Sequence, residues 1–263
     1  MSTTMTTIDT GRHGVPLPRL IKVEIRKSFD TRAGRWFSAS ILIICALALA
    51  LFAIFAEPGF YDYQEMASIA GGILGFFLPI ILIMLVTAEW GQRTGLVTFT
   101  LEPRRSRVVV AKLAAGTLIS LAVLALAFGI ATLATAFAGV IRDGDVSWSM
   151  DSNVILNFVL ANIFGVLVGF AIAMLLMNTA AAIVVYILYS LVLPTVLGIL
   201  SAVIDGFADI VPWVDFNTAQ EPLFTGDFKL DGQEWAQLAV TGLIWLVIPL
   251  TLGIWRLLRA EVK

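Results

Sequence analysis

The stretch "TAEWGQRTGLVTFTLEPRRSRVVVAK", Thr87 to Lys112, lies between two long apolar runs and indicates how the whole chain is organised. It carries 5 of the chain's 17 Lys and Arg residues, whereas the runs on either side have no charged residue in their interiors. A short basic segment between apolar runs of about 20 residues or more is typical of a loop between membrane-spanning helices. The predicted fold class is therefore an all-α integral membrane protein.

The composition supports the same class. The 263 residues are 59% hydrophobic and 14% charged, whereas soluble domains contain about 25% charged residues. Cys45 is the single cysteine and lies in an apolar run, so we interpret it as a small core side chain. His13 is the single histidine, which argues against a multi-histidine metal site and a histidine-based hydrolase.

Six runs are long and apolar enough to cross a bilayer core of about 30 Å. They are residues 37–56, 66–88, 113–140, 154–177, 179–203 and 236–257. Only Asn178 and Thr179 separate the fourth run from the fifth, so a tight turn is predicted there.

The distribution of charge predicts the orientation. Of the 17 basic residues, 15 lie before the first run, between the second and third runs, or from Arg256 to the end of the chain. The alternate connections are mainly acidic. The positive-inside rule then places both termini in the cytoplasm. High Ala and Gly content and the preference for Arg over Lys hint at a GC-rich bacterial source, and hence at a bacterial cytoplasmic membrane.

The residues before the first run are predicted to form an amphipathic interfacial helix over 17–36, after a disordered cytoplasmic tail at 1–16 and before a six-helix domain at 37–263. Leu17, Ile21, Ile25, Phe29 and Ala33 recur every fourth residue, and basic residues occupy another face. The alternative is a charged lead-in that only sets the topology.

Small residues and prolines mark special positions within the runs. The pairs Gly71/Gly75 and Gly165/Gly169 have the spacing that lets helices approach closely. Proline inside a helix removes a backbone hydrogen bond and favours a kink. Such prolines occur at Pro79, Pro194 and Pro249.

Polar residues are sparse within the runs, and ionisable ones are absent from their middles. Asn157, Asn162, Tyr186 and Tyr189 either hydrogen-bond a neighbouring helix or line a substrate path. The lack of ionisable groups at depth argues against proton-coupled transport. The sequence also lacks G-x-x-x-x-G-K-[ST], G-x-S-x-G and H-E-x-x-H, so no catalytic residue or metal site is predicted and any ATP must be bound by a partner.

Thr87–Lys112 has the character of a docking segment. Glu89 and Arg93 form an i,i+4 pair, and Leu96, Phe99 and Leu101 fall on one side of a short helix that ends at Pro103. The predicted element is a short amphipathic helix that docks a cytoplasmic partner.

The order of these motifs resembles the permease subunits of ABC-2 type transporters. The resemblance rests on Glu89-Trp90, Arg93-Thr94-Gly95, the stretch "TFTLEPRRSR" at 98–107, and Ala111-Lys112. The stretch "PWVDFNTA" at 212–219 is similar to the outer loop that precedes the last span in that family.

The resemblance implies a six-helix, type V exporter-like unit that works with a second permease copy or a paralogue, and with two cytoplasmic ABC ATPase subunits. ATP and Mg²⁺ would be bound by those partners, and this chain would hold no cofactor. The segment from Arg93 to Glu102 would be the coupling helix, and the N-terminal helix the elbow helix. Residues 204–224 would form short re-entrant helices.

The implied function is ATP-driven export of a small hydrophobic or amphipathic compound, such as a drug, an antibiotic or a lipid-like molecule. The ATPase-coupling residues would be Glu89, Arg93, Thr98, Glu102, Arg104 and Arg105. Trp213 and Phe216 would form an outer gate. Attraction to anionic membrane lipids is the alternative explanation for the basic residues, and no nucleic-acid partner is expected.

Three other functions stay open. A secondary carrier without an ATPase would use Asn157, Asn162 and Tyr186 for a sodium-coupled site. A lipid-modifying enzyme would use Asp205 and Asp209, but these residues are predicted to lie on the outer side. A membrane scaffold or sensor would transport nothing.

Overall fold

The computed structural model describes residues 15–30, 32–57, 61–91, 98, 100–142, 146–225 and 230–259. Within this part of the chain, six helices are long and apolar enough to span a membrane, as predicted. They cover Gly34–Phe55, Tyr63–Gly91, Arg105–Ile141, Ser152–Leu176, Thr179–Val203 and Gly232–Arg259. The predicted 1–16 tail lies outside the described residues except for its last two positions.

The described residues form eleven α-helices. They are α1 (Leu17–Asp30), α2 (Arg32–Phe55), α3 (Tyr63–Gly91), α5 (Arg105–Ile141), α6 (Ser152–Leu176), α7 (Thr179–Ile187), α8 (Leu193–Val203), α9 (Val211–Val214), α10 (Phe216–Thr225), α11 (Gly232–Gly242) and α12 (Ile248–Arg259). The wide π-helical turns η1 (Leu188–Val192) and η3 (Leu243–Val247) join α7 to α8 and α11 to α12. A single 3₁₀ turn, η2 (Phe207–Asp209), precedes α9.

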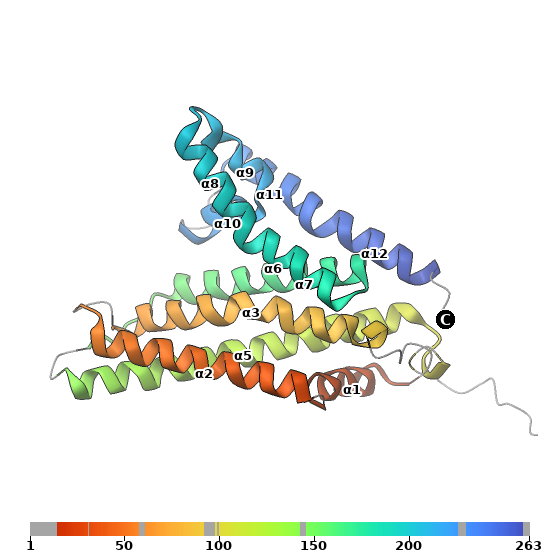
Figure 1. The fold of residues 1–263 in the computed structure, drawn as a ribbon, viewed down its shortest axis with the longest axis horizontal. Helices are drawn as coiled ribbons and strands as arrows, with labels where there is room; N and C mark the ends of the chain where they lie inside the picture. The colour runs from red at the N-terminus through yellow and green to blue at the C-terminus, as the bar shows by residue number, and fades with distance from the viewer. Residues whose placement is uncertain are drawn as a thin grey trace, which may run out of the picture.

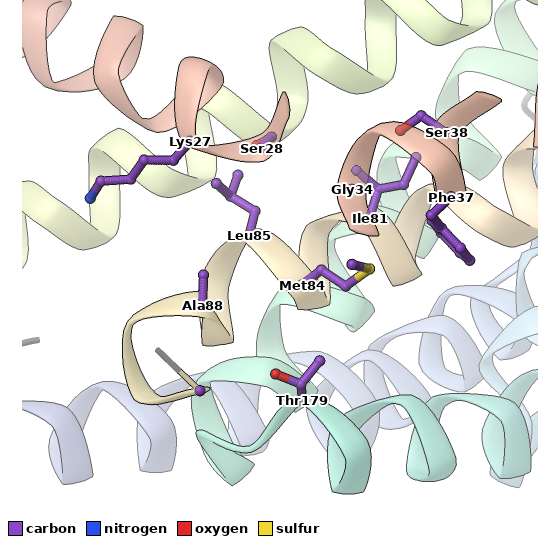
Figure 2. A pocket seen from close by; sticks show the side chains of 11 residues that line it. Lys27, Ser28, Gly34, Phe37, Ser38, Ile81, Met84, Leu85, Ala88 and Thr179 are labelled. Carbon is purple, nitrogen blue, oxygen red and sulfur yellow. The ribbon is translucent and has the colours of Figure 1, made fainter. Parts of the chain in front are cut away.

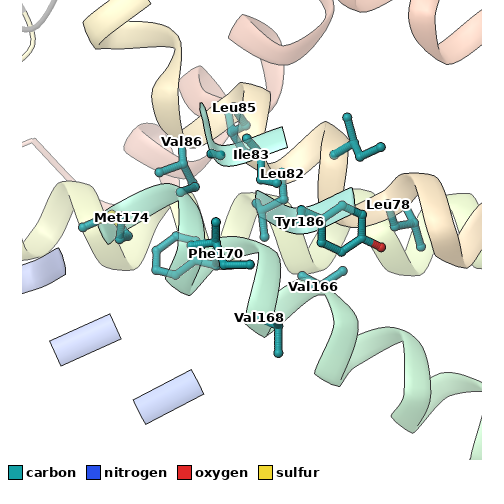
Figure 3. Packing of buried hydrophobic residues seen from close by; sticks show 14 of the residues in the cluster. Leu78, Leu82, Ile83, Leu85, Val86, Val166, Val168, Phe170, Met174 and Tyr186 are labelled. Atoms are coloured by element: carbon teal, nitrogen blue, oxygen red, sulfur yellow. The ribbon is translucent and has the colours of Figure 1, made fainter. Parts of the chain in front are cut away.

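Two groups of helices diverge from one end of the molecule. Figure 1 shows α2, α3 and α5 running side by side, whereas α8 and α11 lie away from them at the opposite end from α1. α6 connects the groups because it packs against both α3 and α12. The main core lies where α3, α5 and α6 meet, and Figure 3 shows Leu82, Ile83, Phe170 and Met174 packed within it.

The predicted close helix approach occurs between α3 and α6. A Cβ added to Gly71 would overlap the ring of Phe158, and one added to Gly75 would lie 2.6 Å from Asn162 Oδ1. A Cβ on Gly169 would lie 3.0 Å from the backbone Cα of Pro79. At Gly169 the neighbour is backbone, so a side chain there would push the two helices apart, whereas at Gly71 and Gly75 it would displace the side chains of Phe158 and Asn162.

Two of the three prolines follow the wide turns. Pro194 is the second residue after η1, and Pro249 is the second residue after η3. A proline ring displaces the carbonyl group four residues earlier, and a wide turn accommodates that displacement within a continuous span. Pro79 instead lies inside α3.

The tight turn expected at Asn178 is present. α6 ends at Leu176, Met177 adopts a left-handed conformation with φ of 50°, and α7 starts at Thr179. The side chain of Asn178 accepts a hydrogen bond from Ala181 N at 2.9 Å, which caps α7.

Hydrogen bonds between distant segments define two ends of the bundle. At one end, which we call the basic end, Arg107 donates to Val15 O at 2.6 Å, and Arg256 donates to Leu175 O at 2.9 Å. At the other end, Arg142 donates to Ala53 O at 3.0 Å and to Ala56 O at 2.7 Å. Arg142 therefore satisfies carbonyl groups at the end of α2, which explains an arginine in an otherwise acidic connection.

The helix predicted over residues 17–36 is shorter in the structure. α1 covers Leu17–Asp30, and the residues from Arg32 to Trp36 belong to α2. α1 packs against α2, α3 and α5, and its Ile21 and Ile25 contact the main core. α5 is longer than predicted, because it begins at Arg105 rather than at Leu113.

Candidate functional site

Four charged side chains meet inside the basic end. Lys112 Nζ of α5 lies 2.7 Å from Glu24 Oε2 of α1 and 3.4 Å from Glu89 Oε1 of α3. Lys27 Nζ of α1 lies 2.7 Å from Glu24 Oε1 and 3.3 Å from Glu89 Oε1, which Lys112 also contacts. We call these four residues the ion quartet. Its two carboxylates and two ammonium groups balance, so it can be buried without net charge.

Three of the four side chains in the quartet are buried, which makes their pairing energetically important. Glu24, Glu89 and Lys112 are 4%, 2% and 2% exposed. Lys112 also donates to Leu85 O at 3.2 Å, which ties the start of α5 to the last turns of α3. Charges removed from water this far are stable only when paired, so each member depends on the two oppositely charged members that it contacts.

The pKa values of the two α1 members shift in the directions that pairing requires. Burial by itself raises the pKa of Glu24, but Lys112 and then Lys27 outweigh it, so the pKa of this carboxyl lies below its usual value. Burial lowers the pKa of Lys27, but Glu24 and Glu89 outweigh it and raise the pKa above its usual value. Both groups therefore stay charged across the physiological range.

The predicted docking segment lies next to the quartet. Glu102 N donates to Thr98 O at 3.0 Å, which closes the last helical turn before Pro103. Glu102 is only 3% exposed, and its Oε2 lies 3.1 Å from Arg107 Nη1. Arg107 in turn donates to Val15 O ahead of α1. We call residues 98 and 100–104 the connecting turn.

The predicted coupling residues fall into two groups in this structure. Glu89 and Glu102 point inward and are paired within the chain, so they do not form the exposed contact surface expected from the sequence. Arg104 is exposed, and Thr98 is half-buried. Arg105 donates to Leu257 O near the end of α12. Arg93, together with the apolar Leu96 and Phe99, lies outside the described residues.

A cavity of about 200 Å³ opens beside the quartet (Figure 2). It lies among α1, α2, α3 and α7 and is mostly apolar. Its polar lining comes from Lys27, Ser28, Ser38 and Thr179, and Figure 2 shows Thr179 across the cavity from Ser28. Thr179 also shares a hydrogen bond of 2.7 Å with Thr87, which links α7 to α3.

The predicted path residues lie between helices of this chain. Asn162 Nδ2 donates to Phe158 O at 2.8 Å, and Tyr186 hydroxyl donates to Phe76 O at 2.9 Å. Tyr189 hydroxyl lies 3.4 Å from Asn217 Oδ1, and Asn157 is 9% exposed. Asn162 and Tyr186 thus meet α3 at consecutive residues, Gly75 and Phe76. The contacts of Tyr186 and Tyr189 fit the interhelical hydrogen-bonding interpretation, whereas the hydrogen bond of Asn162 stays within α6 and its buried Oδ1 has no hydrogen-bond partner among the described residues.

The predicted outer gate residues occupy different environments. Phe216 is 2% exposed, and its ring centroid lies 5.7 Å from that of Phe164 on α6. Trp213 is half-buried on the short helix α9. Between them, Asp215 is buried and caps α10 by accepting from Thr218 N at 3.1 Å. Residues 204–224, which the resemblance implied to be re-entrant helices, contain the short elements η2 and α9 and all but the last residue of α10.

Sequence reasoning did not identify Glu24, Lys27 and Lys112 as site residues. The sequence placed Lys112 only at the end of the basic segment that precedes the third apolar run. One signal was available, since Glu24 and Lys27 form an i,i+3 pair on α1. No family model matches this chain, and no curated protein matches it either.

Proposed function

We propose that this chain is the permease subunit of an ABC-2 type exporter in a bacterial cytoplasmic membrane. It would move a small hydrophobic or amphipathic compound with energy from a separate ATPase subunit, because the sequence has no P-loop. The observation that carries the proposal is the ion quartet, which joins α1, α3 and α5 about two turns along α5 from the connecting turn.

The quartet and the turn together form a linkage suited to transmitting force. Glu102 pairs with Arg107, which donates a hydrogen bond to Val15 O ahead of α1. Arg105 donates a hydrogen bond to Leu257 O near the end of α12. A partner that presses on the connecting turn would therefore move α1, α5 and α12 together. Such a partner drives a change in the bundle only if its contacts differ between the two conformations.

The exposed part of the connecting turn would be the contact surface. Leu101 is 72% exposed, and Pro103 and Arg104 are exposed beside it. An exposed leucine flanked by a cationic residue fits a cleft with an apolar floor and an acidic rim. Glu89 and Glu102 would support this surface from behind rather than touch the partner.

A second copy of the chain would complete the pathway. In an apolar stretch of 18 residues from each span, 17% is buried in the fifth span and 11% in the sixth, compared with 56% in the second. These two spans diverge from α2, α3 and α5 at the end opposite to α1 (Figure 1). Two copies facing each other through α7–α8 and α11–α12 would enclose an apolar space, which suits an apolar or amphipathic cargo.

The first experiment is gentle purification of the full chain from its native membrane, followed by mass spectrometry and an ATP hydrolysis assay. We expect a P-loop subunit in stoichiometric amount. The variant Leu101→Ser/Arg104→Ala should lower the chain-stimulated hydrolysis and transport at least severalfold, because it removes the exposed contact surface. The control Arg32→Ala removes an exposed arginine at the start of α2 and should leave both unchanged.

Two results would contradict the proposal. The first is a chain that purifies alone, hydrolyses no ATP and transports without it, which would favour a secondary carrier. The second is normal ATP-driven transport by Leu101→Ser/Arg104→Ala, which would place the docking surface elsewhere.

A further inference from the structure

A second cavity, of about 290 Å³, lies among α1, α2, α3 and α5. Its size is near the lower limit of small-molecule sites, which begin at about 300 Å³. Ser38 is the only polar residue among those that line it. Leu118 and Leu126 are each about half exposed on α5, so the cavity is open along the side of the bundle. In a membrane, that side faces lipid.

Two exposed cations lie on the helix faces that border this cavity. On α1, Lys22 precedes the lining residues Ile25 and Phe29 by three and seven positions, so it lies on their stripe. On α2, Arg35 precedes Ser38 and Leu42 by the same intervals. Neither cation forms an ion pair with a described residue, whereas Lys27 and Lys112 are neutralised in the quartet.

We propose that this cavity binds one acyl chain of an anionic phospholipid, with its phosphate group held by Lys22 and Arg35. The apolar walls replace contacts between the chain and neighbouring lipids, and the small polar Ser38 lies at the border with the first cavity. The exposed cations supply the selectivity, because each Lys or Arg near an anionic membrane surface favours binding by about fivefold. An anionic head group is therefore preferred over a zwitterionic one.

The occupant is a resident lipid rather than the cargo of the proposed exporter. The first cavity, beside the quartet, has several polar lining groups and reaches α7, whereas this one is almost wholly apolar and is bordered by α1, α2, α3 and α5. A lipid wedged there would brace α1 against the bundle and so fix the position of the ion quartet.

The test uses the full chain in detergent micelles, without any ATPase, so it is independent of the proposed function. Dioleoyl phosphatidylglycerol and dioleoyl phosphatidylcholine are titrated separately, and bound lipid is counted by native mass spectrometry. We expect one tightly held phosphatidylglycerol molecule. Lys22→Gln/Arg35→Gln should weaken its binding about 30-fold and weaken phosphatidylcholine binding much less, because the choline group already neutralises that phosphate.

Two further variants make the test specific. Arg19→Gln/Arg32→Gln removes the same charge from exposed positions on other faces of α1 and α2, and it should bind phosphatidylglycerol normally. Ala122→Trp fills the cavity from the exposed face of α5 and should abolish tight binding of both lipids. Equal affinity for the two lipids, an equal loss in both charge pairs, or full binding by Ala122→Trp would each overturn the proposal.

Discussion

Replacing Lys112 by methionine tests the energetic role of the ion quartet. The substitution keeps the volume and removes the charge, which leaves Glu24 and Glu89 buried with Lys27 as their single counter-ion. At an effective dielectric constant of about 20, the 2.7 Å contact between Lys112 and Glu24 corresponds to about 6 kcal/mol of Coulomb attraction. Most of this attraction is offset by the desolvation of the buried ions.

The expected loss comes from the carboxylate that remains unpaired. Removing one partner of a buried ion pair costs about 3–5 kcal/mol in free energy of unfolding. The corresponding change at Lys27, whose side chain is 36% exposed, should cost only about 1 kcal/mol because water replaces the lost partner. Lys27→Met is therefore the matched control.

The assay is reversible unfolding of the full chain in mixed micelles, with SDS as the denaturant and tryptophan fluorescence as the signal. A third variant, Glu24→Gln/Lys112→Met, leaves Glu89 and Lys27 as a neutral pair 3.3 Å apart. It should be more stable than Lys112→Met alone. The reasoning is refuted if Lys112→Met costs no more than Lys27→Met, or if the double variant is the least stable of the three.

Two further predictions concern packing and pH. Gly253→Ala should lower the free energy of unfolding by about 1–3 kcal/mol, because its Cβ would lie 2.6 Å from the backbone carbonyl carbon of Met174. Gly198→Ala meets open space and should raise the free energy of unfolding slightly. SDS unfolding of both variants measures the difference, and equal effects would contradict the close approach of α12 to α6. The stability that ionised Glu24 contributes is present above the ordinary carboxyl pKa of 4.5 and lost as pH falls through its lower folded value, and the contribution of Lys27 is present below 10.5 and lost as pH rises through its higher folded value. The difference in unfolding free energy between wild type and Glu24→Gln should thus be constant at neutral pH and shrink at acid pH, and a difference that grows on acidification would contradict the pairing.

The number and place of the spans could be predicted because the bilayer acts on each segment separately. Every backbone polar group must be satisfied within a segment, so length and hydropathy alone identify a spanning helix. The turn at Asn178 could also be predicted, because two capping-type residues interrupt an apolar run. The third run was predicted to start at residue 113 because the charged Lys112 was left in the preceding loop, whereas the fold provides Lys112 with two carboxylates inside α5.

The connecting turn shows the limit of sequence reasoning for the site. Its basic residues and Pro103 marked a special segment, and Arg104 is exposed there as a docking residue would be. The inward orientation of Glu102 depends on Arg107 and on the segment before α1, which lies far away in the sequence. No local periodicity encodes such a contact.

By itself, the sequence determined an all-helical chain with six apolar spans and a concentration of basic residues in alternate connections, since these properties depend on local composition and on the bilayer as solvent. Only the tertiary structure decided that Glu24, Glu89 and Lys112 meet in a buried, neutral cluster. The reason is that a charge is tolerated away from water only beside its counter-ions, and those come from three helices that folding alone brings together.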